Sequence, residues 1–175
     1  MRQLNRGFTL IEAMVVITIV VLLILAGLPS LSSFLANAKL RDGAATFAAT
    51  INTARNEAVR RNCSVSITPM YSAVTLAKGA NCPASVLSAR ASGLPKVVAL
   101  PDRLQVVLKT VDGTIVPRAV LNSMGQVVPF GVAYQANMVL EGHACIDDVR
   151  CPAVIVEAGG TANICAKGAL NGVCL

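Results

Sequence analysis

The sequence has little of what most enzymes use for catalysis. Its 175 residues include one histidine, His143, and no tryptophan. A serine or cysteine nucleophile needs a neighbouring base, most often a histidine, and no nucleophile-elbow pattern surrounds a serine here. A phosphate-cradling glycine loop is also missing. We therefore expect a non-enzymatic protein with no catalytic residues and no cofactor, built as one ordinary domain plus an additional segment.

Charged residues are scarce as well. They make up 14% of the chain, against 54% hydrophobic residues, and the mean hydropathy is +0.64. The apolar residues concentrate in residues 8–28, where Glu12 is the one charged side chain. Such a helix spans about 30 Å, the thickness of a bilayer core. Arg2 and Arg6 precede it, and basic residues beside such a helix usually stay cytoplasmic. The sequence thus predicts a transmembrane helix over residues 8–29 with a cytoplasmic N-terminus.

The helical pattern continues past this segment, as it would not after a secretory signal peptide. Through residues 30–62, apolar residues recur at three- and four-residue spacing, namely Leu31, Phe34, Leu35, Ala38, Phe47, Ile51, Ala54 and Ala58. This spacing predicts an amphipathic continuation of the same helix. Pro29 removes a backbone hydrogen-bond donor and is expected to bend the helix. Gly43 marks a second position where the helix could bend. The cationic residues near Arg60 to Asn62 favour a helix end there.

After the helix, the hydrophobic period changes to two. Residues 63–68 and 104–109 alternate apolar and polar side chains, which predicts strands. Asp112-Gly113 is a hairpin-turn signal before residues 114–116, where Pro117 weakens the return strand. Shorter strands are expected at residues 126–128, 137–140 and 153–157. The predicted fold class is α+β, with the second half of the helix packed on a small antiparallel sheet in a head formed by residues 63–175.

All six cysteines follow the apolar segment. An even number outside the cytoplasm indicates disulfides, and six cysteines permit 15 pairings. Proximity in the sequence favours three pairs, which are Cys63 with Cys82, Cys145 with Cys151, and Cys165 with Cys174.

The segment around the second pair has an alternative interpretation as a metal site. Zinc could use ligands among His143, Cys145, Asp147, Asp148 and Cys151, and calcium could use the two aspartates. We favour a surface loop closed by the disulfide, with the histidine and aspartates solvated, and we expect no metal.

The most specific pattern lies at the start of the chain. Residues 6–12 read Arg-Gly-Phe-Thr-Leu-Ile-Glu and lead directly into the apolar helix. This stretch resembles the prepilin processing signature of the type IV pilin superfamily. The resemblance implies a leader of residues 1–7, cleavage after Gly7 by a prepilin peptidase, and methylation of the new N-terminal Phe8. It also implies an inner-membrane anchor with a periplasmic head, which then enters a pilus or pseudopilus.

Glu12 is an unusual residue for an apolar helix, independently of the resemblance. A carboxylate inside a bilayer costs roughly 2.5 to 3.5 kcal/mol on insertion scales, so it needs a partner or a purpose. Cleavage would create an ammonium at Phe8, about 6 Å from Glu12 along a helix. Pairing of the two groups, in one subunit or between neighbours, would set the register of helices added to a filament. The alternative is an ordinary signal anchor with Glu12 near the headgroups, which leaves Gly7 and Phe8 unexplained.

Two segments of the head extend the resemblance. Residues 54–62 resemble the helix end of FimT/FimU-type minor pilins and of H-type pseudopilins of type II secretion, and residues 121–125 resemble their mid-head turn. This resemblance implies a minor subunit of a type IV pilus, assembled with other pilins. The alternatives are an H-type pseudopilin and a DNA-uptake pilin.

DNA binding is expected to be weak or absent. In DNA-binding relatives the resemblance calls for a Gly-Arg-x-Arg arrangement near the C-terminus, but Thr161 and Asn163 stand where the arginines would be. Cationic contacts supply most non-specific affinity for DNA, and stacking of single strands needs aromatic side chains, which are few. The remaining candidates for a weak phosphate contact are Arg55, Arg60 and Arg61, for which a solvated basic helix end is the alternative interpretation.

Overall fold

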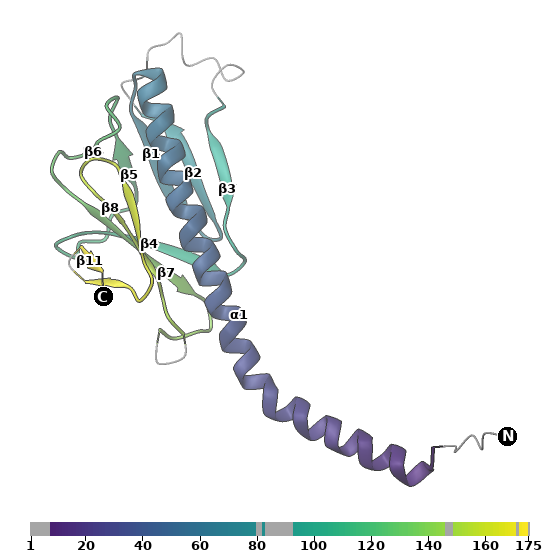
Figure 1. Ribbon diagram of the computed structural model, residues 1–175. Helices are drawn as coiled ribbons and strands as arrows, with labels where there is room; N and C mark the ends of the chain where they lie inside the picture. Colours follow the sequence, from purple (N-terminus) through teal and green to yellow (C-terminus); the bar gives the residue numbers. More distant parts are fainter. Residues whose placement is uncertain (1–7, 80–81, 83–92, 146–148, 171, 175) are drawn as a thin grey trace, which may run out of the picture. The chain divides into compact units, whose positions relative to one another are not determined.

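The computed structural model describes residues 8–79, 82, 93–145, 149–170 and 172–174. The chain forms two compact units, Met1–Leu35 and Ala36–Leu175. The helix α1, Leu10–Arg61, contributes residues to both of them. The second unit consists of the rest of this helix and antiparallel sheets (Figure 1). This is the predicted α+β class.

The ends of α1 follow from local chemistry. The helix begins at Leu10, two residues later than predicted, and it remains helical through Pro29 and Gly43. It ends at Arg61, where Asn62 adopts a φ of 50° and donates from its backbone N–H to the Val59 carbonyl at 3.2 Å. A residue in the left-handed region just after a helix is a common C-terminal cap. The bend at Pro29 remains a prediction.

One face of α1 is buried in the head. Its buried hydrophobic members are Ala36, Leu40, Ala44, Phe47, Ala48, Ile51, Ala54 and Ala58. The four later residues of the predicted stripe are among them. Leu31, Phe34, Leu35 and Ala38 are exposed instead. The first three precede Ala36, the first buried residue in the described part of the helix, and Ala38 lies outside the buried face. Gly43 serves close packing, since a Cβ there would collide with the side chain of Leu104.

The larger sheet contains five strands in the order β3-β2-β1-β5-β6. Their bounds are β1 Val65–Met70, β2 Ala73–Lys78, β3 Lys96–Ala99, β5 Ala119–Leu121 and β6 Val127–Val128. All pairings are antiparallel, and in the register of β1 and β2 Ile67 lies opposite Leu76. Both residues belong to the core with Phe47 and Ile51 of the helix.

The second sheet has the order β4-β7-β8-β9, also antiparallel. Its strands are β4 Leu104–Thr110, β7 Tyr134–Leu140, β8 Ala153–Val156 and β9 Ala162–Cys165. A small hairpin of β10, Ala169–Leu170, and β11, Val173–Cys174, follows. The buried Gln135 holds this hairpin, because its side-chain amide donates to the Ala169 carbonyl at 2.6 Å.

The predicted strands all find a counterpart, with one exception. Residues 114–116 form a single bridge between Ile115 and Lys109 rather than a strand. The turn at Asp112-Gly113 is present, with Thr110 N–H donating to the Thr114 carbonyl at 2.9 Å. Pro117 follows at once and cannot donate to a ladder, which explains why the pairing stops.

Candidate functional site

The segment after the predicted cleavage point is held by a helix cap. Gly7 lies outside the described residues, whereas Phe8 and Thr9 precede α1 and are not helical. The Thr9 hydroxyl accepts a hydrogen bond from the Glu12 backbone N–H at 3.4 Å. A threonine followed three residues later by glutamate is a capping-box sequence, and an acidic residue suits the positive end of the helix dipole. Glu12 therefore takes part in the cap through its backbone N–H, a contact that the sequence interpretation missed, although the Thr9–Glu12 spacing carries its signal.

The helical start also changes the geometry expected for Phe8. The estimate of about 6 Å between its nitrogen and Glu12 required a helical Phe8. The structure places the helix start at Leu10, because Thr9 serves as the N-cap. An amine at Phe8 is therefore not held at a fixed helical distance from the carboxylate of its own chain.

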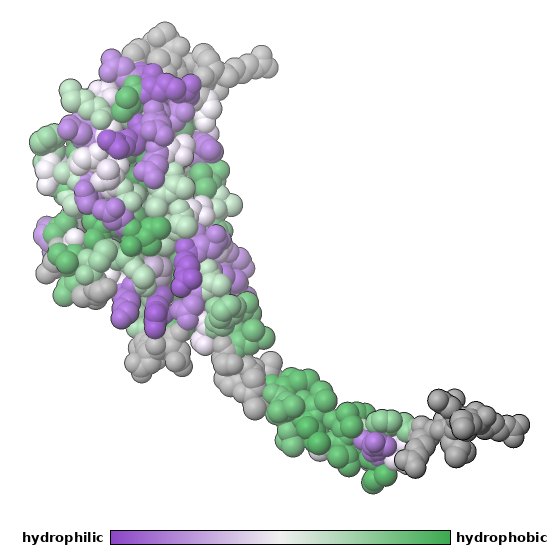
Figure 2. Space-filling model, viewed as in Figure 1, coloured by the Kyte–Doolittle hydropathy of each residue, from purple (hydrophilic) through white to green (hydrophobic). Residues whose placement is uncertain are grey.

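Apolar side chains surround α1 from Leu10 to Leu25. Leucines, isoleucines and valines on every side of this segment are exposed, and Figure 2 shows an almost wholly hydrophobic surface along it. A helix that is apolar all round needs cover from lipid or from other helices. Among the described residues, no helical stretch meets both the length and the hydropathy that crossing a membrane requires.

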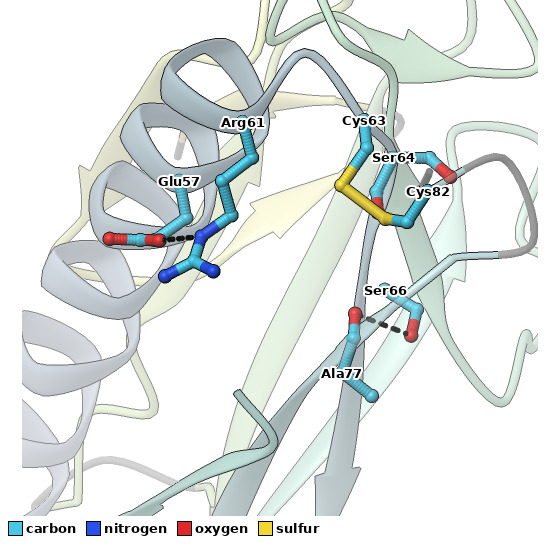
Figure 3. The surroundings of a disulfide bond; sticks show 7 residues. All are labelled: Glu57, Arg61, Cys63, Ser64, Ser66, Ala77 and Cys82. Carbon is cyan, nitrogen blue, oxygen red and sulfur yellow. Dashed lines mark hydrogen bonds and ion pairs between the residues drawn. A yellow bond between two sulfur atoms is a disulfide. The ribbon is translucent and has the colours of Figure 1, made fainter. Parts of the chain in front are cut away.

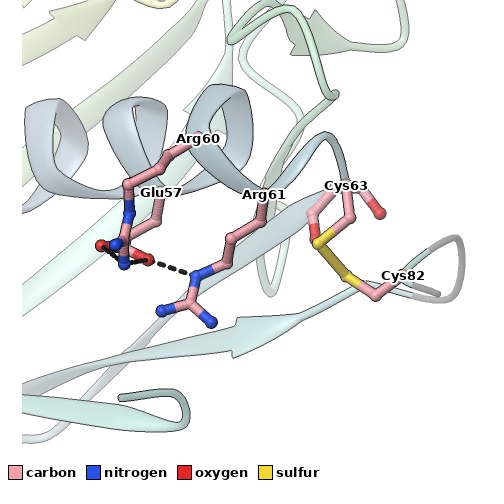
Figure 4. A network of polar contacts seen from close by, with 6 residues as sticks. Glu57, Arg60, Arg61, Cys63 and Cys82 are labelled. Carbon is pink, nitrogen blue, oxygen red and sulfur yellow. Dashed lines mark hydrogen bonds and ion pairs between the residues drawn. A yellow bond between two sulfur atoms is a disulfide. The ribbon is translucent and has the colours of Figure 1, made fainter. Parts of the chain in front are cut away.

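At the other end of α1, a carboxylate pairs with two arginines. Arg60 donates through Nη2 to both oxygens of Glu57, at 2.9 and 3.0 Å, and Arg61 donates through Nε to the same carboxylate (Figure 4). Burial alone would raise the pKa of Glu57, but these hydrogen bonds and the attraction of both guanidinium groups outweigh it. The pKa of Glu57 therefore lies below its ordinary value.

The two arginines differ in exposure. The Arg60 side chain is 67% exposed, whereas that of Arg61 is 10% exposed. Arg61 extends from the last turn of α1 beside the start of β1 (Figure 3). It is therefore not part of a solvated basic face, and one of the three candidate phosphate ligands is largely withdrawn from solvent.

Arg55 has a packing role. A Cβ placed at Gly125 would lie 2.7 Å from Arg55 Cγ and 3.1 Å from Val59 Cγ2. A Cβ placed at Gly160 would lie 3.5 Å from Arg55 Cδ. The alkyl stem of Arg55 thus packs against two glycine turns. The structure brings together residues 54–62, residues 121–125 and the turn at Gly160 that precedes Thr161.

The position of the missing arginines carries a negative group. Glu157 accepts from the Thr161 hydroxyl at 3.0 Å and from the Asn163 side-chain amide at 2.6 Å. Thr161 and Asn163, which stand where the arginines would be, therefore bind a carboxylate and present no positive charge. An anionic phosphate would meet an acidic group here.

The three disulfides join the pairs that sequence proximity favours. Cys63–Cys82 ties the start of β1 to the segment after β2 (Figure 3), Cys145–Cys151 closes the loop before β8, and Cys165–Cys174 ties β9 to β11. The second loop also docks on the helix, because Arg150 N–H donates to the Asn37 side-chain oxygen at 2.8 Å.

The alternative metal ligands are not brought together in the described structure. Cys145 and Cys151 are joined to each other, and His143 is half-buried in the turn after β7. Asp147 and Asp148 lie outside the described residues. No group of three or more histidine, cysteine or acidic side chains suited to a metal occurs in the part of the chain that the structure describes.

Comparison with known proteins matches two family models. Residues 2–28 match the prokaryotic N-terminal methylation motif, and residues 43–160 match the type II transport protein GspH. No curated protein sequence matches the chain significantly.

Solved structures share the fold at low identity. The minor pilin FimU of Pseudomonas aeruginosa has a TM-score of 0.54 and 16% identity, over 75% of this chain and 91% of that one. The minor pseudopilin EpsH of Vibrio cholerae has a TM-score of 0.52 and 12% identity, over 75% and 98% of the two chains. The solution structure of Escherichia coli GspH gives 0.52 and 18%, over 75% and 91%.

The N-terminal methylation motif and the GspH-type head thus both indicate a pilin- or pseudopilin-like protein. Members of this superfamily are processed as prepilins and assemble with other pilins or pseudopilins at a membrane. The chain belongs to the GspH family and is a minor pilin- or pseudopilin-like subunit with a prepilin N-methylation motif.

Proposed function

We propose that this protein is a low-abundance subunit that initiates or caps a type IV pilus, acting as a structural component and not as an enzyme. A prepilin peptidase cleaves it after Gly7 and methylates Phe8. The observation that carries the proposal is the presence of the methylation motif and a GspH-type head on the same chain.

We propose a single-pass topology in the inner membrane, with a cytoplasmic leader and a periplasmic head. Arg2 and Arg6 support this orientation because positive residues flanking the first apolar helix stay inside. The disulfides support it too, since all six paired cysteines follow the apolar segment and disulfides persist in oxidising compartments.

Glu12 is proposed to pair with the Phe8 ammonium of a neighbouring subunit. The helix begins only at Leu10, so the new amine is free of the helical geometry that would hold it near its own Glu12. The apolar surface around this segment needs neighbouring helices or lipid, and an ion pair inside that cover would fix the register of the added subunit.

A secretion pseudopilus is the second candidate, favoured by the name of the matching family model. Isolation of the tagged full-length protein from its native membrane, with identification of the subunits that co-purify, distinguishes a type IV pilus from a secretion pseudopilus. We expect the co-purifying subunits to be pilins of a type IV pilus. Recovery with pseudopilins alone would assign the subunit to secretion, and recovery with neither would refute the proposal.

A role in DNA uptake is the third candidate. We expect the compact unit of residues 36–175, which is the head with its part of α1, to bind DNA with a Kd weaker than about 1 µM near physiological salt. Arg61 is only 10% exposed and lies in the wall of a cavity rather than on an open surface that a DNA backbone could follow, and Glu157 occupies the C-terminal segment. A gel-shift titration at low and moderate salt measures this affinity.

The matched variants for that titration are Arg60→Ala and the exposed Arg118→Ala, which remove one positive charge each. Submicromolar binding that Arg60→Ala abolishes and Arg118→Ala preserves would show that DNA binding resides at the helix end.

A further inference from the structure

A charged cavity lies between the end of α1 and the strands β2 and β3. It has a volume of about 350 Å³, and its walls include Glu57, Arg60 and Arg61 from the helix and Lys96 from β3. The buried Leu76 and Leu94 contribute apolar walls. Three positive groups face one carboxylate, so the cavity carries an excess of two positive charges.

Arg61 contributes a guanidinium group to the wall of this cavity. Its Nε bonds Glu57, while its two terminal nitrogens point away from that carboxylate (Figure 4). The side chain is 10% exposed, and its contact with Glu57 runs through Nε. A guanidinium fork of this kind matches a carboxylate or phosphate through paired N–H donors.

Lys96 adds a second positive group from the opposite element. It is exposed on the edge strand β3, and within the described residues it forms no ion pair. An incoming anion would therefore meet an ammonium at the rim and a guanidinium fork inside. Burial makes the inner contact stronger than an exposed surface pair.

We propose that this cavity receives the carboxylate of an aspartate or glutamate side chain from a neighbouring subunit in the filament. The inference rests on the proposed function as a filament subunit. The apolar walls suit the methylene groups of such a side chain, and the cavity volume of about 350 Å³ is large enough to admit it. Stacking of nucleotides would call for aromatic walls, and the cavity lining contains none among the described residues.

A zero-length cross-link tests the contact in assembled filaments of the full-length protein. A carbodiimide joins the Lys96 amine to an adjacent carboxylate as an amide, and the reagent takes up the water that is lost. We expect peptide mass spectrometry to find Lys96 linked to an acidic residue of another subunit. The variant Lys96→Arg keeps the charge and lacks the amine, so it should lose the cross-link and still assemble.

Incorporation into filaments provides a second readout. Lys96→Gln should lower it about tenfold, whereas Lys167→Gln, the same change at an exposed lysine outside the cavity, should leave it unchanged. The inference is overturned if Lys96 is linked only to Glu57 of its own chain, or remains unlinked while other lysines react, or if Lys96→Gln assembles normally.

Two further outcomes separate the possible failures. If the wild-type protein enters no filament, the proposed function fails and this inference fails with it. If Lys96→Gln assembles normally but loses DNA affinity in a gel shift, the cavity binds phosphate, which overturns the assignment of a neighbouring carboxylate.

Discussion

Replacing Glu12 by valine is expected to leave the protein cleaved and membrane-bound while lowering its incorporation into filaments roughly a hundredfold or more. Removing one partner of a desolvated ion pair leaves the other charge unpaired, which costs about 3 to 5 kcal/mol. Here that charge is the Phe8 ammonium of the neighbouring subunit. Valine also favours the apolar segment, so insertion into the membrane should not suffer. Quantitative immunoblotting of the membrane and filament fractions measures both effects.

Two further variants separate the charge from its surroundings. Glu12→Ala should behave like Glu12→Val, because both remove the carboxylate. Thr18→Val removes a polar group from the same apolar segment, where the Thr18 hydroxyl only donates to the Met14 carbonyl at 2.8 Å, and it should assemble nearly normally. Wild-type incorporation of both Glu12 variants would show that the carboxylate is not needed for assembly, since both variants keep the backbone N–H that donates to Thr9.

Replacing Gly160 by alanine is expected to destabilise the head by about 2 to 4 kcal/mol, lowering its Tm by roughly 10 °C. Gly160 has a φ of +78°, where a side chain is strained, and its Cβ would collide with the Gly125 carbonyl oxygen. That oxygen belongs to the backbone and cannot move aside like a side chain. The turn also abuts Arg55 of α1, so a shift would loosen the junction of helix and sheets.

The adjacent Gly159 provides the matched control. A Cβ there would meet no atom within 4 Å, and the residue is exposed. Gly159→Ala should therefore change the unfolding free energy by less than about 0.5 kcal/mol. Thermal denaturation of residues 36–175, followed by circular dichroism, compares the variants. Equal melting temperatures for the two would contradict the packing described for Gly125, Gly160 and Arg55.

The features predicted from sequence are those encoded locally. The end of α1 follows from the cationic residues before Asn62, and the alternation in residues 104–109 directly matches β4. The disulfide pairs follow from short separations along the chain. In each case the residues that determine the structure lie close together in sequence.

Some strands escaped prediction because their turns lack the usual signals. The hairpin of β1 and β2 turns at Tyr71-Ser72, where Ser72 rather than glycine adopts a φ of 52°. This serine is fixed by tertiary contacts, since its N–H donates to the Leu104 carbonyl at 3.0 Å and its hydroxyl accepts from the Arg103 N–H at 3.0 Å. Such contacts cannot be inferred from local composition.

The environment of the basic residues at the end of α1 also could not be predicted from local sequence. Its charges were visible in the sequence, and the spacing of Glu57 and Arg61 is one that permits an ion pair on a helix. The burial of Arg61 depends on β2 and β3, which the sequence did not predict, so the cavity could not be anticipated. The contact of Arg55 with Gly125 and Gly160 likewise joins segments far apart along the chain.

Processing of this chain as a prepilin can be measured from the intact mass of the native protein. We expect a mature chain that begins at Phe8, carries one added methyl group, and has six fewer hydrogens because of the three disulfides. A native protein that retains residues 1–7, or one that begins after Pro29, would contradict it.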